Sequence, residues 1–318
     1  MTASTNKRSK HILNREFKNY VENYTPFSWD NKEDDPRSYL RNKHAPLISY
    51  KRFCKVTEYV QSIASPISSV VDVGPYPGTL VRILREFLKM DAEYCGIGLG
   101  FTDEYRVKMK ELNATLFETD IDPDFIEAKE SKDWPCHDSD VCFFLDAIEH
   151  LTSPIYCLDQ VNKALKMGGH LIITTDNITC LGYTYRILTN GKSPNVHPLS
   201  SSMFYRGEWR PHFREYSKDE LMFYLSYCGF KVIKHEYFER EQGDYCLDDE
   251  GRVYKKPRYS GVKGLVVNNL VKYIPHLRDH HILIAEKIED YNDNLLKRPK
   301  PTHSMSEWIQ MRSDAKLI

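Results

Sequence analysis

Short apolar runs alternate with amphipathic segments between Ser69 and Thr175, and no other feature restricts the fold of this chain as strongly. Apolar runs of about four to eight residues are typical of buried strands, and apolar residues recurring every three or four positions are typical of helices. Strands are expected at Val70–Val73, Tyr94–Ile97, Ala114–Phe117, Val141–Leu145 and His170–Thr175. Strands that alternate with helices predict a doubly wound, mostly parallel α/β sheet with right-handed crossovers. Ligands of such a sheet bind at the carboxyl ends of its strands.

A helix with clear start and stop signals follows in the second half of the chain. Ser217 and Glu220 form a capping box at its start, and Gly229 ends it. The apolar stripe between them consists of Leu221, Tyr224, Leu225 and Cys228. Phe230–Phe238 and His280–Lys287 are expected to be the sixth and seventh strands, so the sheet should be seven-stranded and Rossmann-like.

Further helices are expected before and between the strands. Their apolar periodicity places them at about 53–63, 80–88, 105–112, 154–167 and 264–273. Ser153 and Pro154 are typical of an N-cap and a first helical position, and Gly168 is expected to form the turn after that helix.

The expected organisation is a core domain with two insertions and two polar ends. Residues 1–46 are polar and form an N-terminal arm with one or two short helices, and residues 47–287 form the core domain. The insertions at 177–211 and 239–277 lack the strand-helix alternation and are expected to form a lid. The C-terminal tail, 288–318, is polar, with Trp308 as its one strong apolar anchor.

Composition argues against a membrane or nucleic-acid protein. The formal net charge is −1, and no run approaches the roughly 18 to 20 apolar residues needed to cross a bilayer. The eight cysteines are scattered and contain no C-x-x-C pair, so we expect reduced thiols in a cytoplasmic protein. The sequence leaves open whether the chain forms a homo-oligomer.

The stretch VVDVGPYPGTL, Val70–Leu80, is typical of a strand, a tight turn and the start of a helix. Gly74 and Gly78 allow the backbone to turn and approach a ligand closely, and the helix beginning near Thr79 offers free N–H groups. The dinucleotide fingerprint G-x-G-x-x-G is not met, because its third glycine is missing. Taken alone, this stretch is weak evidence, because a plain turn between a strand and a helix remains an alternative.

Four more segments follow in order: FETDID (117–122), SDVCFFLDAIEHL (139–151), ALKMGGHLIITT (164–175) and HFREYSKDELMFYLSYCGF (212–230). Together with the glycine loop, they resemble the class I S-adenosylmethionine-dependent methyltransferases over about residues 68–238. The loop and the EHL segment are most similar to small-molecule and glycan methyltransferases of bacterial biosynthesis. The resemblance implies an enzyme with S-adenosylmethionine as its cofactor.

The resemblance also implies where the cofactor binds. The matching positions are Asp72, Gly74, Tyr76, Pro77, Gly78 and Thr79 after the first strand, Gly98 and Leu99 after the second, Asp120 and Ile121 after the third, and Asp146 and Ala147 after the fourth. In the family, the first group surrounds the methionine part, the third contacts the adenine, and the fourth lies under the reactive methyl group.

One position departs from the family pattern. Relatives carry an acid at the end of the second strand to hold the ribose hydroxyls, and this chain has Gly98 there. Either Asp103 or Glu104 reaches back to the ribose, or cofactor binding is weaker by about 1.5–3 kcal/mol. Tyr76 replaces the usual middle glycine, so its ring must point away from the cofactor.

Methyl transfer to a hydroxyl requires an aligned acceptor and removal of its proton. The candidate bases near the strand ends are His150, His212 and Asp146. Glu149 precedes His150 and is able to orient its ring, although the pair is equally typical of a loop start. Asp146 is expected to contact the cofactor or the acceptor rather than to act as the base.

Aromatic and arginine residues are interleaved around the first insertion. We expect Tyr205, Arg206, Trp209 and Arg214 to contact the substrate, because aromatic faces stack on sugar rings and arginines bind carboxylates or phosphates. The alternatives are a lid whose aromatics pack on the sheet and an RNA-binding surface, and the near-neutral charge argues against RNA. The Cys and His pairs lack metal-ligand spacing, so no metal site is expected.

The sequence therefore predicts O-methylation of a hydroxyl on a sugar or another small biosynthetic intermediate. An N-methyltransferase or RNA methyltransferase is the alternative within enzymes. A binding or scaffold protein that keeps the fold without catalysis is the alternative outside enzymes, because the acid of the second strand and the middle glycine are missing.

Overall fold

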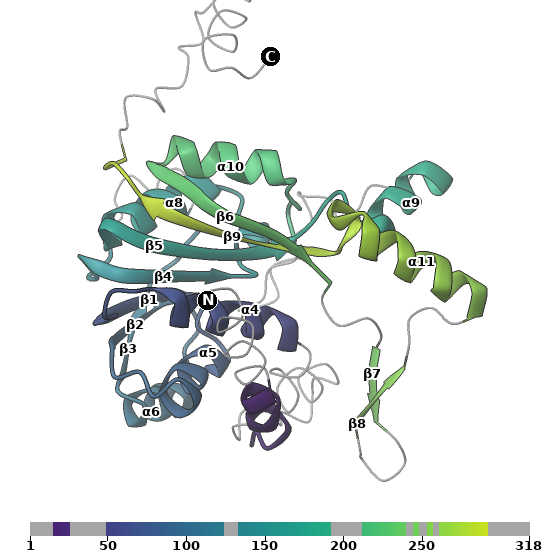
Figure 1. Ribbon diagram of the computed structural model, residues 1–318. Helices are drawn as coiled ribbons and strands as arrows, with labels where there is room; N and C mark the ends of the chain where they lie inside the picture. Colours follow the sequence, from purple (N-terminus) through teal and green to yellow (C-terminus); the bar gives the residue numbers. More distant parts are fainter. Residues whose placement is uncertain are drawn as a thin grey trace, which may run out of the picture.

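The computed structural model describes residues 15–25, 49–123, 133–191, 212–239 and 261–291, and the backbone of 244–247 and 253–256. A seven-stranded sheet with the order β3-β2-β1-β4-β5-β9-β6 forms its centre (Figure 1). The first five strands pair in parallel, and β9 runs antiparallel between β5 and β6. The predicted fold class, a seven-stranded and mostly parallel Rossmann-like sheet, is confirmed.

Each of the seven predicted strands is present. Their bounds are β1 Ser69–Val73, β2 Glu93–Gly98, β3 Ala114–Glu118, β4 Ser139–Leu145, β5 Leu165–Asp176, β6 Phe230–Phe238 and β9 His280–Lys287. The interior of β4 is almost wholly buried, as expected of a central parallel strand covered on both faces.

Helices cover both faces of the sheet (Figure 1). On one face lie α4 Tyr50–Ser62, α5 Thr79–Arg82 with its π-helical continuation Ile83–Phe87, and α6 Asp103–Glu111, and on the other lie α8 Pro154–Ala164 and α10 Lys218–Tyr227. Because side chains alternate along a strand, Val70 packs in the first core and Val71 in the second. Residues 15–22 form one more helix, and its Phe17 and Val21 pack into the first core.

The predicted start and end of α10 are confirmed, whereas the predicted end of α8 is wrong. Ser217 and Glu220 make both hydrogen bonds of the capping box, and Gly229 follows α10 with φ of 82°. The helix that starts at Pro154 ends at Ala164, where β5 begins at once, so the predicted turn at Gly168 is wrong. Gly168 has φ of 74° within the early part of β5.

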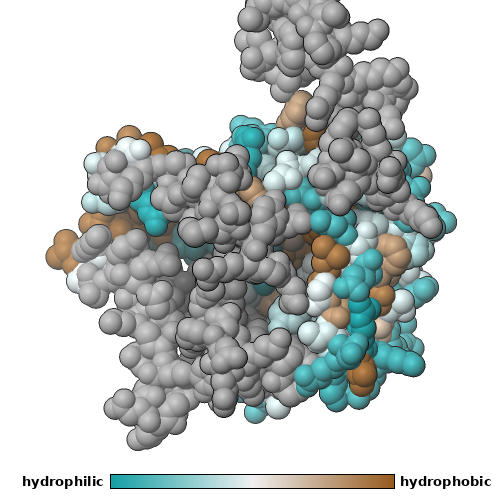
Figure 2. Space-filling view, turned by 180° about the vertical axis from the view of Figure 1, so that it is seen from behind, coloured by the Kyte–Doolittle hydropathy of each residue, from teal (hydrophilic) through white to brown (hydrophobic). Residues whose placement is uncertain are grey.

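Both insertions contribute structure at the carboxyl edge of the parallel strands (Figure 1). The first contains α9 Leu181–Asn190, and the second contains the hairpin β7 Asp244–Leu247 with β8 Val253–Lys256 and the predicted helix, α11 Gly261–Tyr273. Sequence periodicity did not reveal α9 or the hairpin. Apolar side chains of α9 and α11 are exposed at this end of the molecule (Figure 2): Tyr185, Ile187, Leu188, Val262, Leu265, Val266 and Tyr273.

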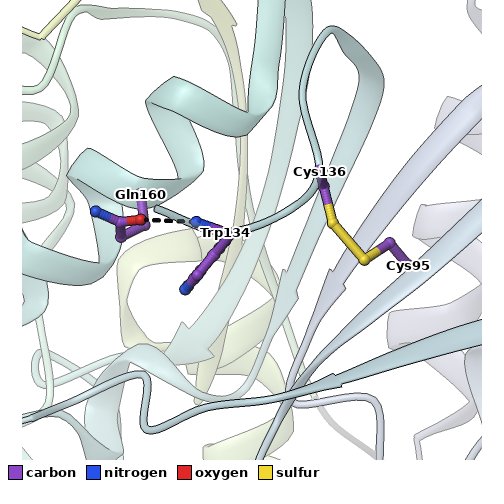
Figure 3. Close-up of a disulfide and its surroundings, with 4 residues drawn as sticks. All are labelled: Cys95, Trp134, Cys136 and Gln160. Atoms are coloured by element: carbon purple, nitrogen blue, oxygen red, sulfur yellow. Dashed lines mark hydrogen bonds between the residues drawn. A yellow bond between two sulfur atoms is a disulfide. The ribbon is translucent and has the colours of Figure 1, made fainter. Parts of the chain in front are cut away.

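A disulfide joins Cys95 in β2 to Cys136 in the segment before β4 (Figure 3). The expectation of reduced thiols throughout is therefore wrong for this pair. The free cysteines of the described part of the chain are Cys54, Cys142, Cys157, Cys180 and Cys228. Trp134 lies buried beside the disulfide, and its backbone N–H donates to Gln160 of α8 over 3.2 Å (Figure 3). Residues 133–136 are thus attached to both β2 and α8.

Among the helices that the structure describes, none has the length and the apolar character that crossing a bilayer requires. The tail residue Trp308 lies outside the described residues.

Candidate functional site

The glycine loop after β1 turns sharply at the carboxyl edge of the sheet. Gly74 and Gly78 have φ of 76° and 91°, a conformation that L side chains rarely adopt, and the Tyr76–Pro77 peptide is cis. The loop is fixed by hydrogen bonds from the Gly74 N–H to Ile97 over 2.9 Å and from the Gly78 N–H to Pro75 over 2.8 Å. A Cβ added at Gly74 would lie 3.7 Å from the Cβ of Ala147, an ordinary van der Waals distance, so the positive φ and not a lack of room favours glycine here.

The remaining residues of the loop lead into α5 and contact α6. Gly78 is the N-cap of α5, and Thr79 is its buried first residue. The ring of Tyr76 is about half exposed and lies 5.5 Å from that of Tyr105, measured between centroids. The Tyr105 hydroxyl donates to the carbonyl of Pro75 over 3.0 Å, so α6 supports the loop from below.

Asp72 lies inside the protein and not at its surface. Its side chain is 3% exposed, and one carboxylate oxygen accepts a 2.5 Å hydrogen bond from the hydroxyl of Tyr94. Burial raises the pKa of Asp72 to about 7, while the Tyr94 hydrogen bond and the charge of Arg52 act in the opposite direction. Asp72 therefore lies under the glycine loop and reaches a ligand only through its neighbours.

Asp146 lies at the end of β4 with φ of 50°, in the left-handed region. Its carboxylate forms an ion pair with Arg52 of α4 and accepts a 2.7 Å hydrogen bond from the hydroxyl of Thr174. Arg52 also donates to the hydroxyl of Ser49 over 3.0 Å. Because Asp146 is occupied in this way, the structure favours a positioning role for it over that of a base.

The end of β2 leaves little room for a side chain at Gly98. A Cβ there would lie 3.2 Å from the ring of Phe101, which stacks on Tyr105. Leu99 is half exposed beside it. Asp103 and Glu104, the acids considered as substitutes, lie exposed in the first turn of α6. The Phe101 ring thus lies close to where an acidic side chain at this position would begin.

Asp120 and Ile121 lie half-buried in the loop after β3. The Asp120 carboxylate accepts the N–H of Asp122 over 2.9 Å. The buried Asp122 accepts three hydrogen bonds of 2.8 Å, from the N–H and hydroxyl of Thr152 and the N–H of Ser153. Asp122 therefore joins the loop after β3 to the loop after β4.

Two histidines meet where β4 and β5 end. His150 closes a short 3-10 helix, Ile148–His150, and its ring centroid lies 4.6 Å from that of His212 in an edge-to-face arrangement. The backbone N–H of Phe213 donates to the carbonyl of Glu149 over 2.8 Å and holds the two segments together. The structure thus brings together two of the three candidate bases, which are 62 positions apart in the sequence.

Carboxylates surround this histidine pair. The Nδ1 atom of His212 lies 3.1 Å from Glu215 and 3.3 Å from Asp176, the last residue of β5. Asp176 also contacts Nε2 of His280 at 2.6 Å. The Glu149 carboxylate is 1% exposed and accepts a 2.7 Å hydrogen bond from the hydroxyl of Thr175.

The carboxylates shift the pKa of Glu149 and that of His212. Burial raises the pKa of Glu149 to about 8, with the charges of Asp146 and Asp176 adding to the effect. Burial lowers the pKa of His212, but the hydrogen bond to Glu215 and the charges of Glu149 and Asp176 outweigh it, so the net shift is upward. The site attracts positive charge.

Most of the expected substrate contacts cannot be placed. Tyr205, Arg206 and Trp209 lie outside the described residues. Arg214 forms an ion pair with Glu220 of α10, and its guanidinium lies 5.6 Å from the ring centroid of Tyr216. The Arg214 side chain therefore turns toward the start of α10, while its backbone N–H donates to the carbonyl of Glu149 over 3.3 Å.

Four residues of the site were missed at the level of the sequence: Arg52, Asp122, Asp176 and Glu215. Arg52 belongs to a helix before β1, so no spacing relates it to Asp146. Asp176 offered a signal, because it ends a predicted strand at the ligand-binding edge.

A family model described as a methyltransferase domain matches residues 39–235, more than half of the chain. No curated protein matches the sequence.

Solved structures of low identity cover most of the chain. A SAM-dependent methyltransferase from Archaeoglobus fulgidus is 16% identical, with a TM-score of 0.46 over 80% of this chain and 100% of that chain. An S-adenosylmethionine-dependent methyltransferase from Mesorhizobium loti is 14% identical, with a TM-score of 0.40 over 72% of this chain and 95% of that chain. A SAM-dependent methyltransferase from Methanosarcina mazei is 12% identical, with a TM-score of 0.42 over 72% of this chain and 97% of that chain.

Proposed function

Because this chain belongs to the methyltransferase-domain family and is an S-adenosylmethionine-dependent methyltransferase, we propose that its acceptor is a hydroxyl of a sugar or of another small biosynthetic intermediate. The observation that carries the proposal is the pair His150 and His212 at the ends of β4 and β5, with Asp176 and Glu215 against one of the rings. A hydroxyl must lose a proton during methyl transfer, and groups able to promote that loss are gathered here.

The residues at the strand ends fit the cofactor in two of its three parts. The positive φ values of Gly74 and Gly78, and the closeness of Gly74 to Ala147 at the end of β4, support a place for the methionine part. The half-buried Asp120 and Ile121 support a place for the adenine. The ribose has no acid at Gly98, and we propose that backbone groups next to Leu99 hold it instead.

Arg52 adds a contact that the sequence resemblance did not include. Its guanidinium lies at the end of β4 and influences the buried Asp72 below the glycine loop. An arginine binds a carboxylate well because its N–H groups form a planar fork. We therefore assign Arg52 to the carboxylate of the methionine part, with Asp146 holding the guanidinium in place.

S-adenosylmethionine supplies a methyl group on a sulfonium, whose leaving group needs no further activation. The protein's contribution is then alignment of the acceptor and removal of its proton. Tyr205, Arg206 and Trp209 remain proposed as substrate contacts, and the arginine and aromatic content of the first insertion supports a sugar with an anionic group.

A panel of acceptors tests the proposal. The purified chain is incubated with S-adenosylmethionine and glycosides, small amines or RNA, and S-adenosylhomocysteine is quantified. We expect turnover with hydroxyl acceptors, and loss of most of it in His150→Ala and His212→Ala. Turnover with amines or RNA alone, or full activity of both variants on a hydroxyl, would refute the proposal.

A further inference from the structure

The histidine pair belongs to a set of side chains with the composition of a metal site. Glu149, His150 and His212 each offer a ligand atom, and these atoms lie within 4.8 Å of one another. The three residues come from two segments 62 positions apart, and the hydrogen bond from the Phe213 N–H to the Glu149 carbonyl joins the segments. These residues do not follow a metal-ligand spacing in the sequence. For this reason no metal site was expected.

The orientation of His212 suits a metal ligand. Its Nδ1 atom faces Glu215 at 3.1 Å and Asp176 at 3.3 Å, so Nε2 is directed to the opposite side of the ring. Histidines that bind metals almost always use one ring nitrogen for the ion and give the other N–H to a carboxylate or carbonyl. Asp176 and Glu215 therefore fix the ring and its tautomer.

Negative charge is in excess around the set. Glu215 is 2% exposed, and its Oε2 atom has no hydrogen-bond partner among the described residues. Arg52 and Arg214, at this end of the sheet, form ion pairs with Asp146 and Glu220. Buried carboxylates need a compensating charge or a hydrogen bond, and a cation would supply the charge.

We propose that Glu149, His150 and His212 bind one divalent first-row transition-metal ion, with Asp176 and Glu215 orienting His212 from behind. Two imidazoles and one carboxylate suit ions such as Zn²⁺, Mn²⁺ or Fe²⁺ and leave coordination positions open. Thr175, whose hydroxyl donates to Glu149, orients the carboxylate in the same way.

The role of the ion rests on the proposed function, whereas its binding does not. The set lies at the ends of β4 and β5, beside Asp146 and Ala147. A hydroxyl bound at an open position loses its proton more readily, because a metal ion lowers the pKa of a coordinated oxygen. The released proton passes to solvent water, and the imidazoles act through the ion and not as the base. The acceptors best suited to such a site carry two neighbouring oxygens.

Titration with Mn²⁺ alone tests the site, because electron paramagnetic resonance distinguishes the free ion from the bound one. The full chain is titrated without cofactor or acceptor. We expect one bound Mn²⁺ per chain, and at least a tenfold weaker Kd in Glu149→Gln and in His150→Ala. Asp176→Asn should weaken binding as well, by about ten- to a hundredfold, as other outer partners of ligands do.

His235→Ala is the matched control, because this histidine lies in β6, where its ring contacts those of Tyr237, edge to face, and His281, and not the three residues of the set. It should leave Mn²⁺ affinity unchanged. Circular dichroism establishes that each variant is folded, and the nearly isosteric Glu149→Gln decides the outcome if His150→Ala does not fold.

Absence of stoichiometric Mn²⁺ binding, or equal binding by the native chain and the folded Glu149→Gln variant, would overturn the proposal. A parallel titration with S-adenosylhomocysteine separates this failure from failure of the proposed function. Mn²⁺ binding without cofactor binding would leave the metal site standing, and cofactor binding without Mn²⁺ would remove the metal site alone.

Discussion

Arg52 and Asp146, 94 positions apart in the sequence, form an ion pair across the carboxyl edge of the sheet. The pair joins α4 to the end of β4, where Asp146 has a left-handed backbone and accepts a hydrogen bond from Thr174. The helix before the first strand is therefore part of the candidate site and not only a cover for the core.

Replacing Arg52 by Met should weaken binding of S-adenosylhomocysteine by about ten- to a hundredfold. A hydrogen bond to a charged group contributes about 1.5–3 kcal/mol, and the substitution also leaves Asp146 without its partner. Calorimetric titration measures the effect. Lys55→Met is the matched control, because Lys55 lies in the same helix and pairs with Glu236 of β6, so its loss should leave the affinity unchanged. Equal affinities of all three proteins would contradict the role of Arg52.

Asp72 should make stability depend on pH in a defined window. Its pKa is raised from 3.8 to about 7, so its stabilising contribution is complete below about pH 4 and is lost as the pH rises through 7. A shift of this size corresponds to on the order of 4 kcal/mol. The stability of the native protein relative to Asp72→Asn should fall between pH 4 and pH 7, as measured by denaturant unfolding.

Asp140 supplies a control of opposite sign for this experiment. It accepts the N–H groups of Ser68 and Ser69 and pairs with Lys166, and although burial opposes them, these contacts lower its pKa. Its contribution is present above its ordinary pKa and is lost as the pH falls. Stability relative to Asp140→Asn should therefore rise with pH. The same pH trend for both variants would show that the Asp72 assignment is mistaken.

Gly98→Asp should not restore the acid that relatives carry at the end of the second strand. A Cβ at this position meets the ring of Phe101 at 3.2 Å, so the variant should be less stable and should bind S-adenosylhomocysteine no more tightly. Adding Phe101→Ala removes the obstacle, and the double variant should then bind more tightly than Phe101→Ala alone. Tighter binding by Gly98→Asp by itself would show that the ring does not block the position.

Ser217→Ala should cost about 1 kcal/mol of stability, because the capping box at the start of α10 loses the hydrogen bond that the serine accepts from Glu220. The measurement is the unfolding midpoint in denaturant. Affinity for S-adenosylhomocysteine should stay the same, since α10 lies on the outer face of the second core. A change in affinity without a change in stability would contradict this view of the helix.

The Cys95–Cys136 disulfide predicts a pattern of labelling. In the denatured protein without reductant, alkylation should leave these two residues unmodified, and reduction should make both reactive. Mass spectrometry of the peptides reads the result. Labelling of both without reductant would support the sequence-based expectation of free thiols.

The sequence was sufficient for the sheet because burial and local periodicity determine it. Val141–Leu145 is apolar throughout, and the capping box of Ser217 and Glu220 depends on residues three positions apart. Such patterns involve residues close together in the sequence and can therefore be recognised without the structure. The helix α9 was missed although its short sequence is amphipathic, and its apolar side chains Tyr185, Ile187 and Leu188 are exposed and not part of the core.

Most of the predicted residues of the candidate site follow strand ends, and His212 is the exception. Asp146, His150 and the glycine loop lie directly after predicted strands, and their places at the carboxyl edge follow from the topology. The partners of these residues depend on packing between distant segments. Arg52 reaches Asp146 from α4, and the buried Glu215 faces His212 after a long insertion, which no spacing rule anticipates.

Titration of the native chain with S-adenosylhomocysteine tests the account most directly, because the glycine loop, Asp120 and Arg52 are all assigned to one cofactor site. The account predicts one binding site per chain, with weaker binding in Arg52→Met than in Lys55→Met. Absence of binding by the folded native chain would contradict the assignment of this edge of the sheet to the cofactor.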